Sequence, residues 1–90
     1  MKLKSRRLKR LYEKGESGNL PSEMVERIEA ILARLDVMEN IRDMDLPHLR
    51  LHQLKGKRKS QWAVTVRGNY RITFRFVDGR VEDVDFVDYH

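Results

Sequence analysis

The stretch that decides the fold is residues 61–76, which read QWAVTVRGNYRITFRF. On each side of Gly68-Asn69, apolar and polar residues alternate, which is the period of a strand with one buried face. The glycine and asparagine between the two runs are typical of a tight hairpin. The apolar positions would face a core, and the other face would display Thr65, Arg67, Arg71, Thr73 and Arg75.

The same pattern extends in both directions from this hairpin. Asp78-Gly79 is a strong signal for a second tight turn, and residues 81–86 supply a further strand. Upstream, residues 49–53 alternate over a short strand, and residues 55–60 read as a turn. The result is an antiparallel meander of four strands with one dry face and one cationic face.

The first half of the chain has the period of helices. Apolar residues recur at helical spacing from Leu3 to Tyr12, and Gly15 is a natural helix end. A second amphipathic helix is expected from about Ser22 to Met38, followed by a loop over residues 40–47. The predicted fold class is therefore α+β, a single domain over residues 1–90. Its two N-terminal helices pack on one face of a mostly antiparallel meander.

Length and composition exclude several classes of protein. The chain has 90 residues and no cysteine, which excludes a multidomain enzyme, a disulfide scaffold and a thiolate metal site. No apolar run approaches the roughly 20 residues of a membrane helix, so no membrane partner is expected. The first residues lack the apolar core of a signal peptide. A cytoplasmic location is the expectation.

The net charge of +5 is unevenly distributed along the chain. Residues 1–14 carry +6 and residues 15–45 carry −5. Residues 46–75 contain eight Lys and Arg and no acid, whereas residues 76–90 carry −4. A basic window of this length favours a polyanionic partner such as RNA, the alternative being a merely solvated basic surface.

Three histidines, His48, His52 and His90, are the groups that titrate near neutral pH. None forms a pair with the helical spacing of a zinc motif, so neither a metal nor another cofactor is expected. His52 lies on the predicted polar side of its strand. His90 is the last residue in the sequence, and Phe86 and Val87 could anchor the strand just before it. Each histidine could instead be structural or, at the chain end, frayed.

Five segments together carry a family resemblance: residues 11–15, 43–47, 50–56, 61–76 and 85–90. The chain resembles HigB toxins of the RelE/ParE superfamily of toxin–antitoxin systems, in order and over nearly its whole length. It departs from the family in a shortened first strand and in having Gln53 where a proline is common.

The resemblance implies a ribosome-dependent endoribonuclease that cuts mRNA and is neutralised by a HigA-type helix-turn-helix antitoxin. It implies catalytic roles for His52, Asp88, Tyr89 and His90, and it assigns Lys55, Asn69 and Arg71 to the same RNA-binding concavity. The cationic face and the basic turn add further candidates. The predicted catalytic set is His52, Arg71, Asp88, Tyr89 and His90, and the predicted RNA- or ribosome-binding set is Lys55, Lys57, Arg58, Lys59, Arg67, Asn69 and Arg75.

These residue types suit cleavage of RNA through its own 2′-hydroxyl group. The reaction needs a base, an acid and cations for the charge on the phosphorane. His90 or Asp88 is the candidate base and His52 the candidate acid, an order that could be reversed. Three alternatives stay open: a non-catalytic RNA- or ribosome-binding module, a ParE-like gyrase poison, and an inactive protein that only binds an antitoxin.

Overall fold

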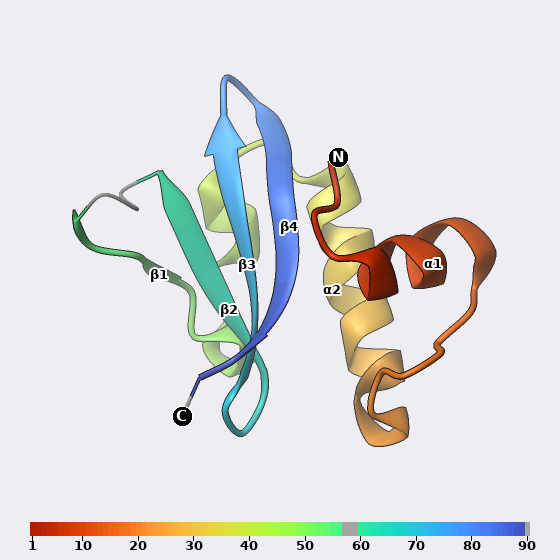
Figure 1. The fold of residues 1–90 in the computed structure, drawn as a ribbon. Coiled ribbons are helices and arrows are strands. Elements are labelled where there is room, and N and C mark those ends of the chain that lie inside the picture. Colours follow the sequence, from red (N-terminus) through yellow and green to blue (C-terminus); the bar gives the residue numbers. More distant parts are fainter. Residues whose placement is uncertain (57–59, 90) are drawn as a thin grey trace.

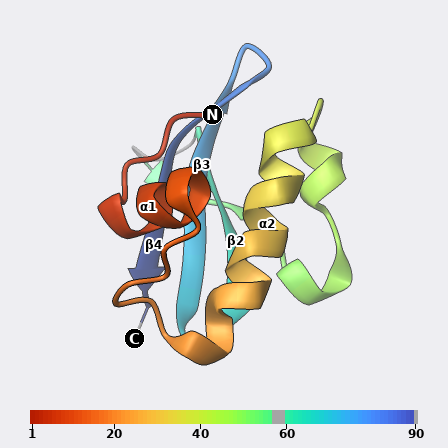
Figure 2. The ribbon, with the colours of Figure 1, turned by 90° about the vertical axis from the view of Figure 1, so that its right-hand side faces the viewer.

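The computed structural model describes residues 1–56 and 60–89, which form two layers. One layer is a four-stranded antiparallel sheet with the strand order β1-β2-β3-β4, and the other contains two helices (Figure 1). Figure 2 shows both helices in front of the sheet, so they cover the same face. The predicted α+β class is therefore confirmed. The elements are α1 (Arg6–Lys14), α2 (Val25–Val37), β1 (His52–Gln53), β2 (Gln61–Arg67), β3 (Tyr70–Val77) and β4 (Arg80–Asp88).

Helix α1 has well-defined signals at both ends. The Ser5 hydroxyl accepts a hydrogen bond from the Leu8 backbone N–H at 3.2 Å, which caps the first turn. Gly15 ends the helix with φ +70°, a left-handed conformation that glycine adopts at little cost. Leu8 and Leu11 are the buried residues of this short helix.

Helix α2 presents its apolar stripe to the sheet. Ile28, Ile31, Leu32 and Leu35 are all buried, at the spacing of one helix face. The predicted first turn from Ser22 is present as a 3₁₀ turn that leads directly into the helix. The two helices are also joined on their outer side, where the Tyr12 hydroxyl donates to Asp36 Oδ1 at 2.8 Å. That hydrogen bond raises the pKa of Tyr12.

The connection from α2 to the sheet is more ordered than the predicted loop. Residues 41–44 and 47–49 form 3₁₀ turns. Asp43 Oδ2 accepts backbone N–H bonds from Glu39 at 2.8 Å and Asn40 at 3.3 Å, and these lower the pKa of Asp43. The strand expected over residues 49–53 is reduced to β1, because Leu49 ends a 3₁₀ turn and Arg50 turns the chain with φ +48°.

Both predicted hairpins are present. Asp78 and Gly79 carry φ +51° and +77°, as a two-residue turn with a right-handed twist requires. Gly68 carries φ +55° in the hairpin between β2 and β3. The alternation within β3 is as expected, since Ile72 and Phe74 are fully buried against the helices. The buried side chains of the two layers form a continuous core.

The N-terminal residues extend the sheet beyond β4. Leu3 forms a parallel bridge with Val84, and the Lys4 backbone N–H donates to the Val84 carbonyl at 2.8 Å. This short parallel pairing corresponds to the shortened first strand that the sequence suggests. No helix among the described residues is long and apolar enough to cross a membrane.

The helix layer generates a stability prediction. Replacing Leu8, which is fully buried, by Ala should lower the free energy of unfolding by about 2–5 kcal/mol, through lost apolar burial and the cavity left behind. Lys9→Ala is the matched control, because the neighbouring residue is exposed and should change stability by less than about 0.5 kcal/mol. Urea denaturation of both variants measures the difference. Equal stabilities would contradict the burial of α1.

Candidate active site

The face of the sheet turned away from the helices, called the open face below, carries side chains in regular rows. Cross-strand partners lie on the same side of a sheet, so the register defines these rows. Leu54 joins the first row through its backbone N–H, which donates to the Gln61 carbonyl at 2.9 Å. The rows are Leu54–Gln61–Arg75, His52–Ala63–Thr73–Asp85 and Thr65–Arg71–Val87.

A hollow of about 230 Å³ crosses this face. Its lining reaches from the end of β1 to the N-terminal segment beside β4, and it includes the residue that follows β4. It thereby brings a predicted catalytic residue, Tyr89, onto the same surface as the strand rows. The lining residues are Lys4, Leu54, Gln61, Thr73, Asp83, Asp85, Val87 and Tyr89.

His52 is exposed at the sheet edge, and its orientation is set by a backbone contact. Its Nδ1 atom lies 3.2 Å from the Arg50 carbonyl oxygen. A carbonyl oxygen can only accept, so Nδ1 carries the proton in the neutral ring and Nε2 has the lone pair. The left-handed conformation of Arg50 turns the chain immediately before His52. Nε2 is therefore the nitrogen available for proton transfer.

Arg71 and Tyr89 meet at the hairpin between β2 and β3. The Arg71 guanidinium carbon lies 5.9 Å from the centre of the Tyr89 ring. Arg71 Nη1 donates to the carbonyls of Gly68 and Tyr70, which holds the guanidinium against the hairpin. The Tyr89 backbone N–H donates to the Asn69 carbonyl at 2.8 Å. Asn69 thus contributes its backbone to fixing Tyr89 beside the hairpin.

The strand register places Asp88 on the helix side of the sheet, opposite the open face. It pairs with Tyr70, whose ring stacks on Phe86 at 5.3 Å between ring centres. Phe86 is part of the core, so this row is directed toward the helices, whereas Arg71 belongs to the open face. His90 lies outside the described residues.

The open face is not uniformly cationic, contrary to the sequence expectation. Strand β4 adds Asp83 and Asp85 to the same hollow. Arg75 is paired, with Nη1 at 3.4 Å from Asp83 Oδ2 and Nε donating to Ser60 Oγ at 3.2 Å. A bulge makes this pair possible, because the register shifts between Thr73 and Arg75. The pairing register of the strands decides which side chains on separate strands meet. The charge distribution along the sequence does not contain that information.

The other predicted binding residues are scattered. A second register shift pairs Arg67 with Tyr70, which sets Arg67 apart from the row that contains Arg71. Lys55 is exposed just beyond β1. Lys57, Arg58 and Lys59 lie outside the described residues.

Sequence reasoning missed four polar residues that line the hollow: Lys4, Gln61, Asp83 and Asp85. A signal for Asp85 was present, because it lies between Val84 and Phe86 in an alternating strand. Thr73 was expected on the polar face, but its position within a hollow was not. Lys4 reaches the hollow only through the parallel pairing with β4, for which the sequence gives no comparable signal.

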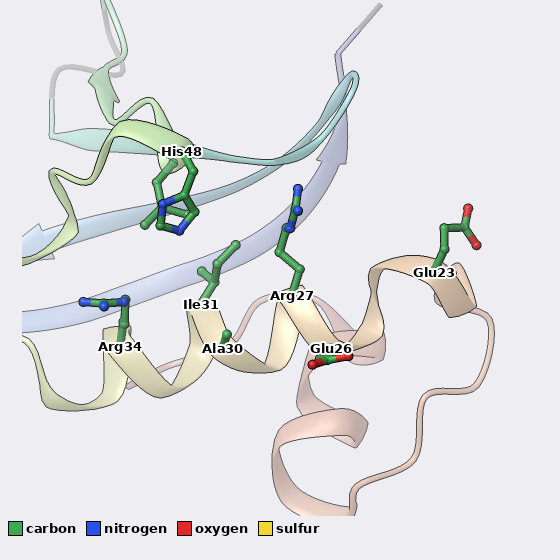
Figure 3. A pocket seen from close by; sticks show the side chains of 8 residues that line it. Glu23, Glu26, Arg27, Ala30, Ile31, Arg34 and His48 are labelled. Atoms are coloured by element: carbon green, nitrogen blue, oxygen red, sulfur yellow. The ribbon is translucent and has the colours of Figure 1, made fainter.

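A second groove, of about 440 Å³, lies on the helix side of the molecule. Figure 3 shows His48 above Ile31 of α2, with Arg27 and Arg34 on either side along the helix. Arg27 Nη1 donates to the Val66 carbonyl at 2.8 Å, so it ties α2 to β2. No predicted site residue lines this groove. Within residues 1–56 and 60–89, no three His, Asp or Glu side chains are grouped closely enough to hold a metal ion.

Comparison with known proteins gives concordant results. A family model described as the RelE-like toxin of type II toxin–antitoxin system HigB matches residues 1–90. The endoribonuclease HigB of Proteus vulgaris is 39% identical over 87 residues, which cover 97% of this chain and 95% of that protein. In fold, the chain is similar to the YoeB-YefM complex from Staphylococcus aureus. The TM-score is 0.62 with 16% identity, over 99% of this chain and 93% of the other.

The His52 contact predicts a measurable tautomer. At a pH above the titration of the ring, the ¹⁵N spectrum of labelled protein should show His52 with its proton on Nδ1, because the Arg50 carbonyl accepts from that atom. The usual preference of free imidazole is for Nε2–H, so His48 provides an internal reference. A predominant Nε2–H form at His52 would contradict the contact.

Proposed function

The chain belongs to the HigB-like family of RelE-like toxins of type II toxin–antitoxin systems, and from this premise we propose that it is an endoribonuclease that cleaves mRNA on translating ribosomes. The name of its Proteus vulgaris relative supports the ribonuclease activity. Its proposed partners are the ribosome with its mRNA and an antitoxin of the HigA type. A cytoplasmic site of action follows from this proposal.

The observation that carries the proposal is the shared open face of His52 and Arg71. They lie two strands apart, which is about 10 Å across the sheet, and in adjacent rows, which adds about 7 Å along the strands, so their backbone positions are about 12 Å apart. A phosphodiester fits between two side chains at this separation. One side chain is a titratable imidazole with an available Nε2, and the other is a permanent cation.

The proposed chemistry needs no metal. A base takes the proton from the 2′-hydroxyl, and the resulting oxygen attacks the adjacent phosphorus. His52 as imidazolium gives a proton from Nε2 to the departing 5′-oxygen. Nε2 must then take up a proton again before the next turnover. Arg71 stabilises the charge on the phosphorane. The products are a 2′,3′-cyclic phosphate and a free 5′-hydroxyl.

The base is proposed to be His90 or Asp88. The register turns Asp88 toward the helix side of the sheet, away from the row of Arg71, which weighs against Asp88 as the base. Tyr89 is proposed to hold the nucleobase next to the cleaved bond. Lys55, Asn69 and the basic residues 57–59, with Arg67 and Arg75, are proposed to contact RNA or the ribosome.

Ribosome dependence follows from the small recognition surface. A single open face with few aromatic side chains outside the core offers little with which to orient free RNA. A ribosome would hold the mRNA in an extended form and supply that orientation. A non-catalytic binding module and a ParE-like gyrase poison are the competing functions, and neither requires a histidine at position 52.

The first functional prediction concerns His52. His52→Ala should lower mRNA cleavage in a translation extract by roughly 100- to 10,000-fold, as expected for loss of a general acid or base. His48→Ala is the control, because it removes another exposed histidine on the helix side. Cleavage is mapped by primer extension, with and without ribosomes. Full activity of His52→Ala would overturn the role of His52 in proton transfer. Equal cutting of naked RNA would overturn the dependence on ribosomes.

The second functional prediction separates catalysis from binding. Arg71→Ala should lower the cleavage rate by roughly 100-fold or more with a small effect on ribosome affinity, because it stabilises charge that develops during the reaction. Replacing Lys57, Arg58 and Lys59 together by Ala should instead weaken ribosome binding and flatten its salt dependence. Affinity and single-turnover rate are measured in parallel. If both variants lost only affinity, a binding module would be the better description.

A further inference from the structure

Strand β2 contains a bulge just before the hairpin that leads into β3. In the register with β3, Thr65 and Arg67 each have a partner, and Val66 lies between them opposite no residue of that strand. Such an extra residue interrupts the regular hydrogen bonds of the ladder. Val66 is also completely buried, so water cannot reach its carbonyl oxygen. A buried carbonyl needs a donor, and this donor must come from another element.

Arg27 on α2 supplies that donor. Its Nη1 atom donates to the Val66 carbonyl at 2.8 Å, although the two residues are 39 positions apart in the sequence. Figure 3 shows the Arg27 side chain directed from α2 toward the sheet, whereas that of Glu26 points the other way. A hydrogen bond from a guanidinium is charge-assisted and therefore stronger than one between neutral groups. Within the described part of the chain, no carboxylate forms an ion pair with Arg27 and competes for it.

The contact supports a part of β2 that β1 does not reach. Strand β1 pairs with β2 at Trp62 and Ala63, both of which precede the bulge. Beyond them β2 continues to Arg67 and into the hairpin, which is paired with β4 only through β3. The hydrogen bond from α2 therefore acts where the sheet itself gives β2 a neighbour on one edge.

The hairpin that follows Val66 holds two residues of the proposed active site. Its three successive carbonyls, at residues 68, 69 and 70, all accept hydrogen bonds from these two residues. Arg71 Nη1 donates to the first and the third, and the Tyr89 backbone N–H donates to the second at 2.8 Å. The position of the hairpin backbone therefore sets the position of both residues, which also contact each other through the guanidinium and the ring.

We infer that Arg27 is a positioning residue for cleavage: through the Val66 carbonyl it fixes the hairpin that holds Arg71 and Tyr89. This inference rests on the proposed ribonuclease function. It places a determinant of the reaction in the helix layer, on the opposite side of the sheet from the open face. Arg27 acts without touching RNA, and its effect on the rate arises because catalysis is sensitive to small displacements of the reacting groups.

The first test observes the hairpin directly and does not depend on catalysis. Arg27→Met keeps most of the aliphatic stem and removes the donors. Arg34→Met is the matched control, because Arg34 lines the same groove and forms no hydrogen bond or ion pair within the described residues. In ¹⁵N-labelled protein, the amide signals of Gly68, Asn69 and Tyr89 should shift in Arg27→Met and remain unchanged in Arg34→Met. Unchanged signals in Arg27→Met would overturn the inference.

The second test separates positioning from stability and from charge. Arg27→Met should lower the single-turnover rate of mRNA cleavage in a translation extract by roughly 10- to 100-fold, as expected for misaligned catalytic groups. Its ribosome affinity should stay nearly unchanged, Arg34→Met should remain fully active, and Arg27→Lys, which keeps a cationic donor, should recover most of the rate. Urea denaturation establishes that every variant is folded under the assay conditions. Equal losses in Arg27→Met and Arg34→Met, or a loss of affinity alone, would overturn the positioning role.

A double-mutant cycle identifies the route by which Arg27 acts. If Arg27 acts through the hairpin, its replacement should have a much smaller effect in a protein that already carries Arg71→Ala, because the group that it positions is then absent. An undiminished loss of rate in the Arg71→Ala protein would overturn this route.

Cleavage by the unaltered protein separates this inference from the function on which it rests. If the unaltered protein does not cleave mRNA, the proposed ribonuclease is refuted, and the hairpin signals then support or overturn the placement of Arg71 and Tyr89 by Arg27 on their own. If the unaltered protein and Arg27→Met cleave equally well, the ribonuclease stands and the inference fails.

Discussion

The open face depends on strand β3 being buried on one side only. Ile72 and Phe74 are completely buried under the helices, and β3 pairs with β2 along one edge and with β4 along the other. The core and both neighbouring strands therefore fix the register of β3. A slip of one residue would bury arginines and expose the largest core side chain. The packing that holds the helices therefore also sets which side chains are presented on the other side.

The charge on that face is divided rather than uniform. Arg71 and the Tyr89 ring lie together at the hairpin, held by backbone carbonyls of residues 68–70. Farther along the sheet, Asp83 neutralises Arg75 and Asp85 stands beside Thr73. The open face therefore presents cations at one end and hydrogen-bond acceptors in the middle.

Local sequence patterns predicted the elements well and their contacts less well. Helices α1 and α2, both tight turns and the alternation of β3 follow from periodicity, capping residues and turn chemistry, which act over a few neighbouring residues. The reduction of β1, the bulge near Asp83 and the bridge between Leu3 and Val84 depend on tertiary packing. The same limit applies to the site. His52 and Arg71 were expected on the open face, but the ion pair that neutralises Arg75 and the row of Asp88 required the register.

The bridge between Leu3 and Val84 also bears on the order in which the molecule forms. These residues are 81 positions apart in the chain, so their pairing closes nearly the longest loop that the sequence allows. Contacts of such separation cost the most chain entropy and form late in folding. During synthesis, the N-terminal segment emerges well before β4, the strand that carries Asp85 and leads into Tyr89. The hollow that Lys4 and Asp85 both line is therefore complete only after this pairing has formed.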